Sequence, residues 1–369
     1  MTHEPPAEDL TPYDAVLLLS FGGPEGPLDV MPFLENVTKG RGVPPQRLAE
    51  VARHYERFGG RSPINDQNRA LLAALRAELA RRGVVQPVYW GNRNWTPYAV
   101  EALRAAHDDG ARRVLVLVTS AYPSYSGCRQ YREDLAGALA QLSNEGRALT
   151  VDKVRHFANH PGFVEPAVDA VGRAVAELPE SSRDGCVVLF TTHSVPIAMN
   201  EVAGPEGGGY VAAHLDVATS IAEELGDRLG RAIRWELVYC SRSGPPQVPW
   251  LEPDVGERLA RLAEEGVPGV VVAPIGFVSD HMEVVFDLDT EARGIAERLG
   301  VPFARAATAG TDRRFVAGLV DLLLERAAAE RGESPPRPAV GKLGPWYDVC
   351  PSGCCRNLRG PQPAVCGVD

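Results

Sequence analysis

The sequence predicts an α/β fold in which helices alternate with the strands of doubly wound parallel sheets. Short, continuously apolar runs rich in Val and Leu recur along the chain. Runs of this kind are typical of strands that are buried on both faces of a parallel sheet. Longer stretches with helical periodicity separate them, and this alternation indicates right-handed βαβ units.

Five apolar runs are expected to form strands. In chain order they are AVLLLS from Ala15, RVLVLV from Arg113, CVVLFTT from Cys186, RWELVYC from Arg234 and GVVVAP from Gly269. Ligands of such sheets bind beyond the carboxyl ends of the strands. The segments SFGGP, TSAYPSYSG, THSVP and PIGFVSDH follow four of these runs, so we expect them at the ligand-binding edge.

Helices are expected between these strands, and they divide the chain into parts. They begin near Asn68, Val164 and Tyr210, and a further one covers RRFVAGLVDLLLERAAAE. The Pro- and Gly-rich stretch after that helix is typical of a linker. We therefore expect an N-terminal domain over 12–150, a C-terminal domain over 151–330, and a linker with a cysteine-rich tail over 331–369. The chain is expected to cross back between the domains near its end.

Composition excludes several classes of protein. Hydrophobic residues make up 44% of the 369 residues, and 38 basic against 48 acidic residues give a net charge of −10. This balance disfavours nucleic acid or an anionic membrane as a partner. No apolar run is long enough to span a membrane, and the acidic start lacks the parts of a signal peptide. A cytoplasmic protein without disulfides is the expectation.

Three carboxylates follow one of the predicted strands at regular spacing. Glu283, Asp287 and Glu291 lie four residues apart, so on a helix they would share a face and repel, by about 0.2–0.5 kcal/mol per pair. A solvated helix face is the ordinary explanation. The helix would, however, begin at the ligand-binding edge, where His193 also ends a strand. A passing divalent cation would relieve the repulsion, and imidazole is a suitable ligand for ferrous iron.

Five motifs in this order resemble the ferrochelatase family, enzymes that insert ferrous iron into a porphyrin. The motifs are LLLSFGGP, YERFGGRSPIN, THSVP, YCSRSGPPQVPWLEP and GFVSDHMEVVFDLD. The resemblance extends from about residue 14 to about residue 329. It implies two similar Rossmann-like, chelatase-type domains with parallel sheets and the porphyrin in a cleft between them. It also implies that the acidic segment is often a π-turn rather than a regular α-helix.

The resemblance assigns roles to individual residues. His193 and Glu283 would be the facing catalytic pair, and Asp287 and Glu291 would continue an iron path away from them. The residues expected to bind the porphyrin are Phe21, Arg41, Ser62, Tyr122, Ser124 and Tyr125. Many bacterial relatives carry Tyr where this chain has Phe21. A phenol oxygen can ligate iron and a phenyl ring cannot, so Phe21 is expected only to pack on the macrocycle.

Four of the seven cysteines lie within the last twenty residues. In a reducing compartment such a cluster indicates a metal, and a structural zinc and an iron–sulfur cluster are both compatible with it. Some actinobacterial ferrochelatases hold a [2Fe–2S] cluster with three tail cysteines and one interior cysteine. The resemblance implies that four of these five are ligands here: Cys128, Cys350, Cys354, Cys355 and Cys366. Cys186 and Cys240 lie in predicted strands and are expected in the core.

The short chain without an added apolar insertion resembles the Gram-positive coproporphyrin ferrochelatases. The predicted function is therefore the insertion of ferrous iron into coproporphyrin III, giving coproheme in haem biosynthesis. The alternatives are insertion into protoporphyrin IX, a cobalt or nickel chelatase, and a non-enzymatic porphyrin or haem carrier with a redox-sensing cluster. The expected partners are the porphyrin and ferrous iron, with transient contacts to neighbouring haem-pathway enzymes and a monomeric state.

Overall fold

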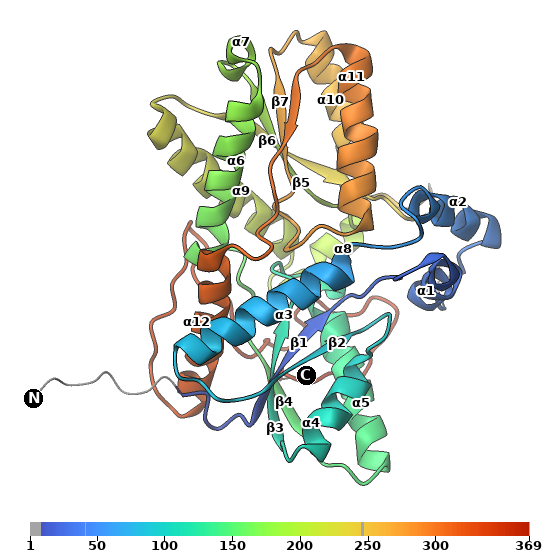
Figure 1. Cartoon of the computed structure of the whole chain (residues 1–369), viewed down its shortest axis with the longest axis vertical. Coiled ribbons are helices and arrows are strands. Elements are labelled where there is room, and N and C mark those ends of the chain that lie inside the picture. The colour runs from blue at the N-terminus through green and yellow to red at the C-terminus, as the bar shows by residue number, and fades with distance from the viewer. Residues whose placement is uncertain (1–8, 41, 245–246, 369) are drawn as a thin grey trace, which may run out of the picture.

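The computed structural model describes residues 9–40, 42–244 and 247–368. They form two lobes, each built on a four-stranded parallel sheet with helices packed against it (Figure 1). This arrangement confirms the predicted α/β class with two similar parallel sheets. Within the described residues, no helix is both long and apolar enough to cross a membrane.

The first sheet has the strand order β2-β1-β3-β4. β1 (Ala15–Ser20) lies between β2 (Val88–Asn92) and β3 (Arg113–Val118), and β4 (Thr150–Lys153) forms one edge. All six residues of β1 are buried. Its even-numbered residues pack in the core that contains helix α3, and its odd-numbered residues pack in the core that contains α4 and α5. Burial on both faces explains the continuous apolar run.

The second sheet repeats this order as β6-β5-β7-β8. Its strands are β5 (Val187–His193), β6 (Arg234–Cys240), β7 (Val270–Ala273) and β8 (Phe303–Arg305). The five predicted apolar runs all form strands. The strands β2, β4 and β8, which the sequence pattern did not reveal, are all at sheet edges, where one neighbour is missing and the apolar pattern is weaker.

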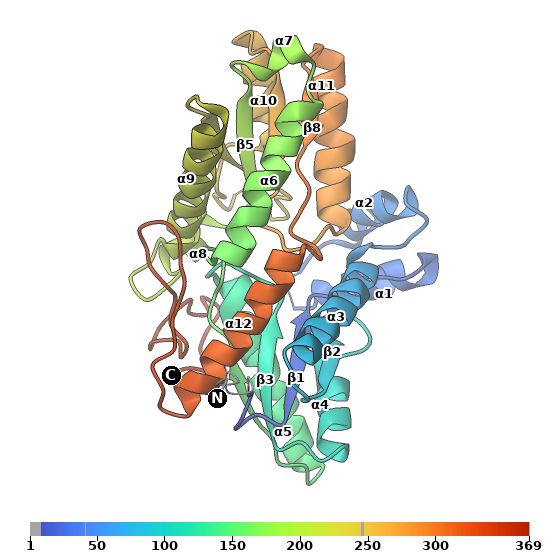
Figure 2. The same ribbon diagram turned by 60° about the vertical axis from the view of Figure 1, so that its left-hand side comes forward.

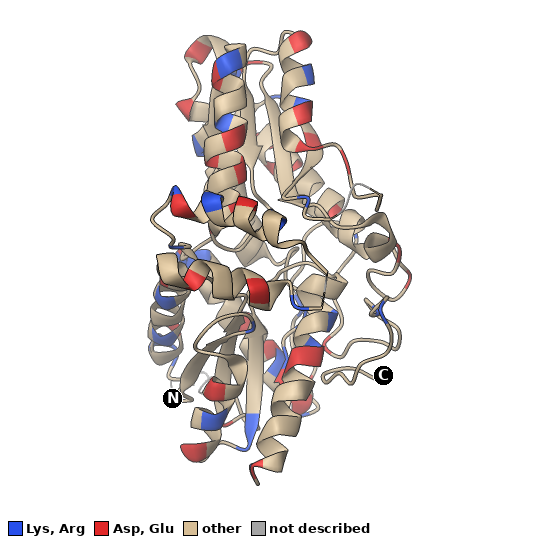
Figure 3. Cartoon of the chain, turned by 90° about the vertical axis from the view of Figure 1, so that its right-hand side faces the viewer, with Lys and Arg blue, Asp and Glu red and all other residues tan. Residues whose placement is uncertain are grey.

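The helices lie on both faces of each sheet (Figure 2). The α-helices are α1 (Val30–Val37), α2 (Pro45–Glu56), α3 (Ile64–Arg81), α4 (Ala99–Asp108), α5 (Gln130–Asn144), α6 (Pro161–Glu177), α7 (Glu180–Arg183), α8 (Ile197–Glu201), α9 (Gly209–Leu229), α10 (Val255–Glu264), α11 (Arg293–Leu299) and α12 (Arg313–Glu330). A 3-10 turn η1 (Pro27–Asp29) and two π-helical segments, η2 (Tyr125–Arg129) and η3 (Val284–Ala292), complete the set. Acidic and basic residues are interspersed along the helices of both lobes (Figure 3).

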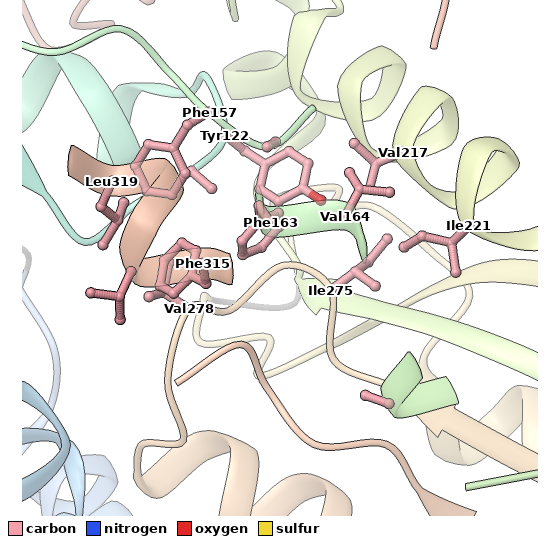
Figure 4. Close-up of a cluster of buried hydrophobic side chains, with 14 of the residues drawn as sticks. Tyr122, Phe157, Phe163, Val164, Val217, Ile221, Ile275, Val278, Phe315 and Leu319 are labelled. Atoms are coloured by element: carbon pink, nitrogen blue, oxygen red, sulfur yellow. The ribbon is translucent and has the colours of Figure 1, made fainter. Parts of the chain in front are cut away.

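The two lobes share a hydrophobic core. Helix α12 packs against α6 of the second lobe and also against α3 of the first, as expected for a chain that crosses back. Tyr122, which follows β3, and Phe157, which lies between β4 and α6, pack with Phe163 and Phe315 in one buried cluster (Figure 4). The strand β4 at this junction pairs with β3 of the first sheet. We propose, as expected from the sequence, an N-terminal domain over 12–150, a C-terminal domain over 151–330 and a tail over 331–369.

A buried ion pair fixes the same junction. Arg155, in the segment that connects the lobes, donates to Glu325 of α12 through Nε (2.6 Å to Oε1) and Nη2 (3.0 Å to Oε2). The two side chains are only 1% and 4% exposed. Arg155 also donates to the backbone oxygen of Pro338 at 3.0 Å. One guanidinium therefore joins the connecting segment, the returning helix and the start of the tail.

We expect Glu325→Gln to destabilise the protein by about 3–5 kcal/mol, because it leaves the Arg155 charge buried without its counter-charge. Urea unfolding followed by circular dichroism would measure the loss. The matched control is Glu50→Gln, which removes an exposed pair with Arg47 and should cost less than about 1 kcal/mol. Equal effects of the two substitutions would contradict a special role for the buried pair.

Candidate active site

His193 is the last residue of β5 and its side chain is 32% exposed. The Tyr210 hydroxyl donates to its backbone oxygen at 2.8 Å and holds the end of the strand. Its Nδ1 contacts the backbone oxygen of Ser194. A carbonyl oxygen can only accept a hydrogen bond, so Nδ1 carries the proton of the neutral ring. The lone pair is therefore on Nε2.

Glu283 directly precedes the π-helical segment η3 and faces the histidine. Its Oε2 lies 3.6 Å from Nε2 of His193, and its side chain is 47% exposed. The two residues are ninety positions apart in the chain and come from the carboxyl ends of the neighbouring strands β5 and β7. The structure thus brings together the two side chains that the sequence predicted as a pair, at a position open to solvent.

A glycine permits the close approach of the two segments. Gly276, in the loop after β7, donates its N–H to the Thr191 oxygen at 3.1 Å. A Cβ at this position would lie 2.1 Å from the hydroxyl oxygen of Thr192 and 2.8 Å from its Cα. No other residue type fits without moving the backbone of β5. The absence of a side chain at Gly276 therefore sets how closely the Glu283 loop approaches His193.

His281 is a neighbour of the pair that the predicted site residues do not include. Its Nδ1 accepts the backbone N–H of Glu283 at 3.2 Å and lies 3.9 Å from the Glu283 carboxylate. Burial lowers the pKa of His281, and the nearby His193 lowers it further, although the Glu283 charge opposes both effects. A neutral His281 can accept this backbone hydrogen bond and so orients Glu283.

The remaining carboxylates of the acidic column lie along η3, which is a π-helix rather than the α-helix of the simple spacing argument. Val284 and Leu288 are buried in the core of the second sheet, and Phe286 is buried in a separate cluster with residues of α1 and α2. Asp287 accepts a hydrogen bond from the Ser241 hydroxyl. Burial raises the pKa of Asp287 to about 7, and the neighbouring carboxylates add to the effect. Glu291 also has a raised pKa, through burial and then through Asp254.

Ser241 is a second residue that sequence reasoning missed. It follows β6 with a φ of 60°, a conformation that is uncommon for a residue other than glycine. This turn aims its hydroxyl at Asp287. The residue lies in the quoted YCSRSGPP motif, so the motif was visible, but the contact with a carboxylate forty-six positions away was not.

Two of the predicted porphyrin-binding residues are accessible. Phe21 is 41% exposed and packs edge to face on Phe33 with 6.3 Å between ring centroids. The Arg93 guanidinium lies 5.8 Å from the Phe21 ring. Tyr125 is partly buried and its hydroxyl donates to Glu133 at 3.1 Å.

The other predicted porphyrin-binding residues are buried or lie outside the described residues. Tyr122 is 3% exposed, and its ring stacks on His214 at 3.6 Å. Ser124 is 2% exposed and its side chain accepts the N–H of Gly127, which caps η2. Ser62 is 3% exposed. Arg41 is outside the described residues.

Two hollows of about 290 and 280 Å³ lie away from the histidine–glutamate pair. One is between α9 and the tail, where Asp216 and Trp346 line it. The other is between α6 and the loops that follow β7 and β8, around Phe277. Neither hollow is lined by His193 or Glu283.

Four cysteines come together beside the first lobe. Cys128, in η2, packs with Cys350, Cys354 and Cys355 of the tail, and all four are at most 1% exposed. The sulfurs of Cys128 and Cys350 are 3.8 Å apart, as are those of Cys354 and Cys355. Two ligand sulfurs on one tetrahedral metal, with bonds of about 2.3 Å, lie about 3.8 Å apart. The sulfurs of Cys128 and Cys350, and those of Cys354 and Cys355, are therefore each as far apart as two ligands of one tetrahedral metal.

Cys366, the fifth candidate, lies outside this group. Its sulfur donates to the Val151 oxygen of β4 at 3.5 Å and packs against the core of the first lobe. Cys186 and Cys240 are each 1% exposed within separate hydrophobic cores, as predicted for structural residues. In the described part of the chain, no three His, Cys, Asp or Glu side chains come together as a group that could hold one metal ion, and the four cysteines make their sulfur contacts in two pairs at 3.8 Å.

Comparisons with known proteins identify extensive similarity. A model of the ferrochelatase family matches residues 13–327. The coproporphyrin III ferrochelatase of Streptomyces coelicolor is 58% identical over 371 residues, covering 99% of this chain and 99% of that protein. Its namesake from Streptomyces griseus is 59% identical over 98% of each chain. Among solved structures, SirB from Bacillus subtilis with Fe3+ aligns with a TM-score of 0.49 at 14% identity, covering 86% of this chain and 97% of that chain.

We expect the Asp287 carboxyl group to titrate with a midpoint near pH 7, neutral below it and charged above it. Infrared difference spectra between about pH 5 and pH 9 would show the carboxyl band, and Asp287→Asn identifies it by removing it. Ser241→Ala should raise the midpoint, because the Ser241 hydrogen bond stabilises the charged form. A midpoint below about 5, the ordinary range of aspartates, would contradict the burial of this group.

Proposed function

The chain belongs to the ferrochelatase family, and from that premise we propose that it inserts ferrous iron into coproporphyrin III to give coproheme in haem biosynthesis. The observation that carries the proposal is the 3.6 Å approach of His193 Nε2 and Glu283 Oε2 at the open edge of the second sheet. Relatives at 53–59% identity over nearly the whole chain are named coproporphyrin III ferrochelatases, which supports the choice of porphyrin.

His193 supplies the base that the reaction requires. Two pyrrole N–H protons must leave the macrocycle as Fe²⁺ enters. Because Nδ1 is held as a donor to the Ser194 oxygen, Nε2 is the atom that accepts a proton or contacts the metal. The Glu283 carboxylate at 3.6 Å stabilises the charged imidazolium that results.

The acidic column supplies a path for the metal. Glu283, Asp287 and Glu291 present oxygen ligands along η3, and hydrated divalent cations bind such ligands readily. Repulsion among these carboxylates falls when a cation is present. Since the pKa of Asp287 is about 7, iron capture should weaken as the pH falls below neutrality and this carboxylate becomes protonated.

The porphyrin is proposed to contact the residues expected from the sequence: Phe21, Arg41, Ser62, Tyr122, Ser124 and Tyr125. Phe21 and Tyr125 are accessible, so ring packing by these two needs no rearrangement. Tyr122 and Ser124 are 3% and 2% exposed, so their contact with the porphyrin requires the loop that carries them to move. An arginine such as Arg41 would pair with a propionate in bidentate fashion.

We propose that Cys128, Cys350, Cys354 and Cys355 hold a [2Fe–2S] cluster. The two sulfur pairs, each 3.8 Å apart, fit two irons with two thiolates each. When bound, such a cluster would supply iron–thiolate bonds that fasten the tail to the first lobe. Metal insertion itself changes no oxidation state.

The location, oligomeric state and partners of the enzyme are also proposed. We place the enzyme in the cytoplasm as a monomer, in transient contact with neighbouring haem-pathway enzymes. The net charge of −10 supports a protein that binds neither nucleic acid nor an anionic membrane.

Anaerobic protein given Fe²⁺ and coproporphyrin III should metalate the porphyrin, as followed by absorbance. His193→Ala should lower kcat by at least about 100-fold, the usual contribution of a general base, while porphyrin binding measured by fluorescence quenching is retained. His107→Ala, in the last turn of α4, is the matched control. Retained turnover in the His193 variant would refute its role. Faster metalation of protoporphyrin IX by the wild type would instead assign the alternative substrate.

The protein as purified should contain two irons and two sulfides per chain. Cys350→Ser should abolish the visible absorption of the cluster, because the substitution removes one of four ligands. Cys366→Ser should leave it unchanged, because the Cys366 sulfur is bonded to the Val151 oxygen instead. Stoichiometric zinc without sulfide in the wild type would establish a structural zinc site in place of the cluster.

A further inference from the structure

A buried lysine ends the strand that contacts the cysteine-rich tail. Lys153 is the last residue of β4 and is only 3% exposed. Its ammonium group donates to the backbone oxygen of Val154 at 2.8 Å. Among the described residues, no carboxylate forms an ion pair with it, unlike the buried Arg155 with Glu325. A buried cation without a counter-charge is costly, so its partner should be sought among the other groups nearby.

Lys153 lies on the same face of β4 as Val151, which packs against Cys366 of the tail. Burial lowers the pKa of Lys153, but Cys128, Cys350 and Cys366 raise it by a larger total amount, despite the opposing charge of Arg132. An anionic occupant of the cysteine site would thus supply the missing counter-charge. Neutral thiols would not supply it.

Backbone contacts explain why these groups converge. Lys153 pairs in register with Val116 of β3, the strand that leads into the loop of Cys128. The sulfur of Cys366 donates to Val151 of the same strand β4, and the Cys366 oxygen accepts the N–H of Cys350 at 3.3 Å. The strand β4 therefore contacts the tail through Cys366, and the tail contacts the loop of Cys128 through Cys350.

We propose that Lys153 is the counter-charge of the cysteine site and raises the reduction potential of the cluster bound there. The inference rests on the cluster of the proposed function. Four thiolates around an oxidised [2Fe–2S] core carry a net charge of −2, and one electron from an external reductant makes it −3 without forming or breaking a bond. A nearby buried cation stabilises the reduced state more than the oxidised state.

The test measures the midpoint potential of the full-length holoprotein by titration with dithionite, using the electron paramagnetic resonance signal of the reduced cluster. Lys153→Gln keeps a hydrogen-bond donor for the Val154 oxygen but removes the charge. It should shift the reduction equilibrium at least tenfold toward the oxidised state, which is about 59 mV for one electron. Lys153→Met should do the same.

Two controls separate charge from structure. Lys153→Arg keeps the charge and should hold the equilibrium within about threefold of the wild type, about 30 mV. Lys342→Gln makes the same substitution at an exposed position of the tail and should change nothing. If the uncharged variants lose the cluster while the arginine variant keeps it, the counter-charge role is supported. If all three Lys153 variants lose it, the role is steric and the inference is overturned.

The result also distinguishes failure of this inference from failure of the proposed cluster. If the wild-type protein contains iron and sulfide, and Lys153→Gln has the same midpoint potential as the wild type, the inference is overturned and the proposed cluster stands. Wild-type protein with zinc, or with neither metal nor sulfide, would overturn the cluster before any variant is made, and the inference with it.

Discussion

The junction of the two lobes is the constraint on which the rest of the structure depends. Arg155 and Glu325 are almost completely buried, and their bidentate contact is made between the connecting segment and the returning helix α12. Around them, aromatic side chains from both lobes form one core (Figure 4). Two lobes that share a core and a desolvated ion pair hold a defined relative position.

Within that frame, the candidate site is assembled by close packing at strand ends. His193 and Glu283 approach because Gly276 lets the loop after β7 lie against Thr192 at the end of β5. The ring of His193 is oriented by a backbone carbonyl, which leaves Nε2 toward the glutamate. The π-helix that follows buries four of its apolar side chains, and its carboxylate Asp287 accepts a hydrogen bond from Ser241. The histidine and the carboxylates of this site are ordinary residue types, and it is the close approach of His193 to Glu283 that distinguishes them.

The tail is also held by contacts with both lobes. It starts at the Arg155 contact with Pro338, and its cysteines then meet Cys128 of the first lobe. Cys355 accepts the N–H of Gly204, in the loop of the second lobe that follows α8. The cysteine group therefore contacts both lobes, close in sequence to Tyr125 on one side and to the His193 segment on the other. A cluster held there would reinforce the junction that the ion pair establishes.

The sequence by itself determined the features that depend on neighbours along the chain. Continuous apolar runs predicted the central strands, because a strand that is buried on both faces needs an apolar side chain at every position. The position of His193 at the ligand-binding edge could also be predicted, because the carboxyl ends of parallel strands meet at one edge of the sheet. Tertiary structure alone decided which distant groups meet. It separated Cys366 from the other four cysteines, buried Tyr122 against His214, aimed Ser241 at Asp287 and left Lys153 beside thiols. These contacts join residues far apart in the chain, and their formation depends on packing that no local pattern contains.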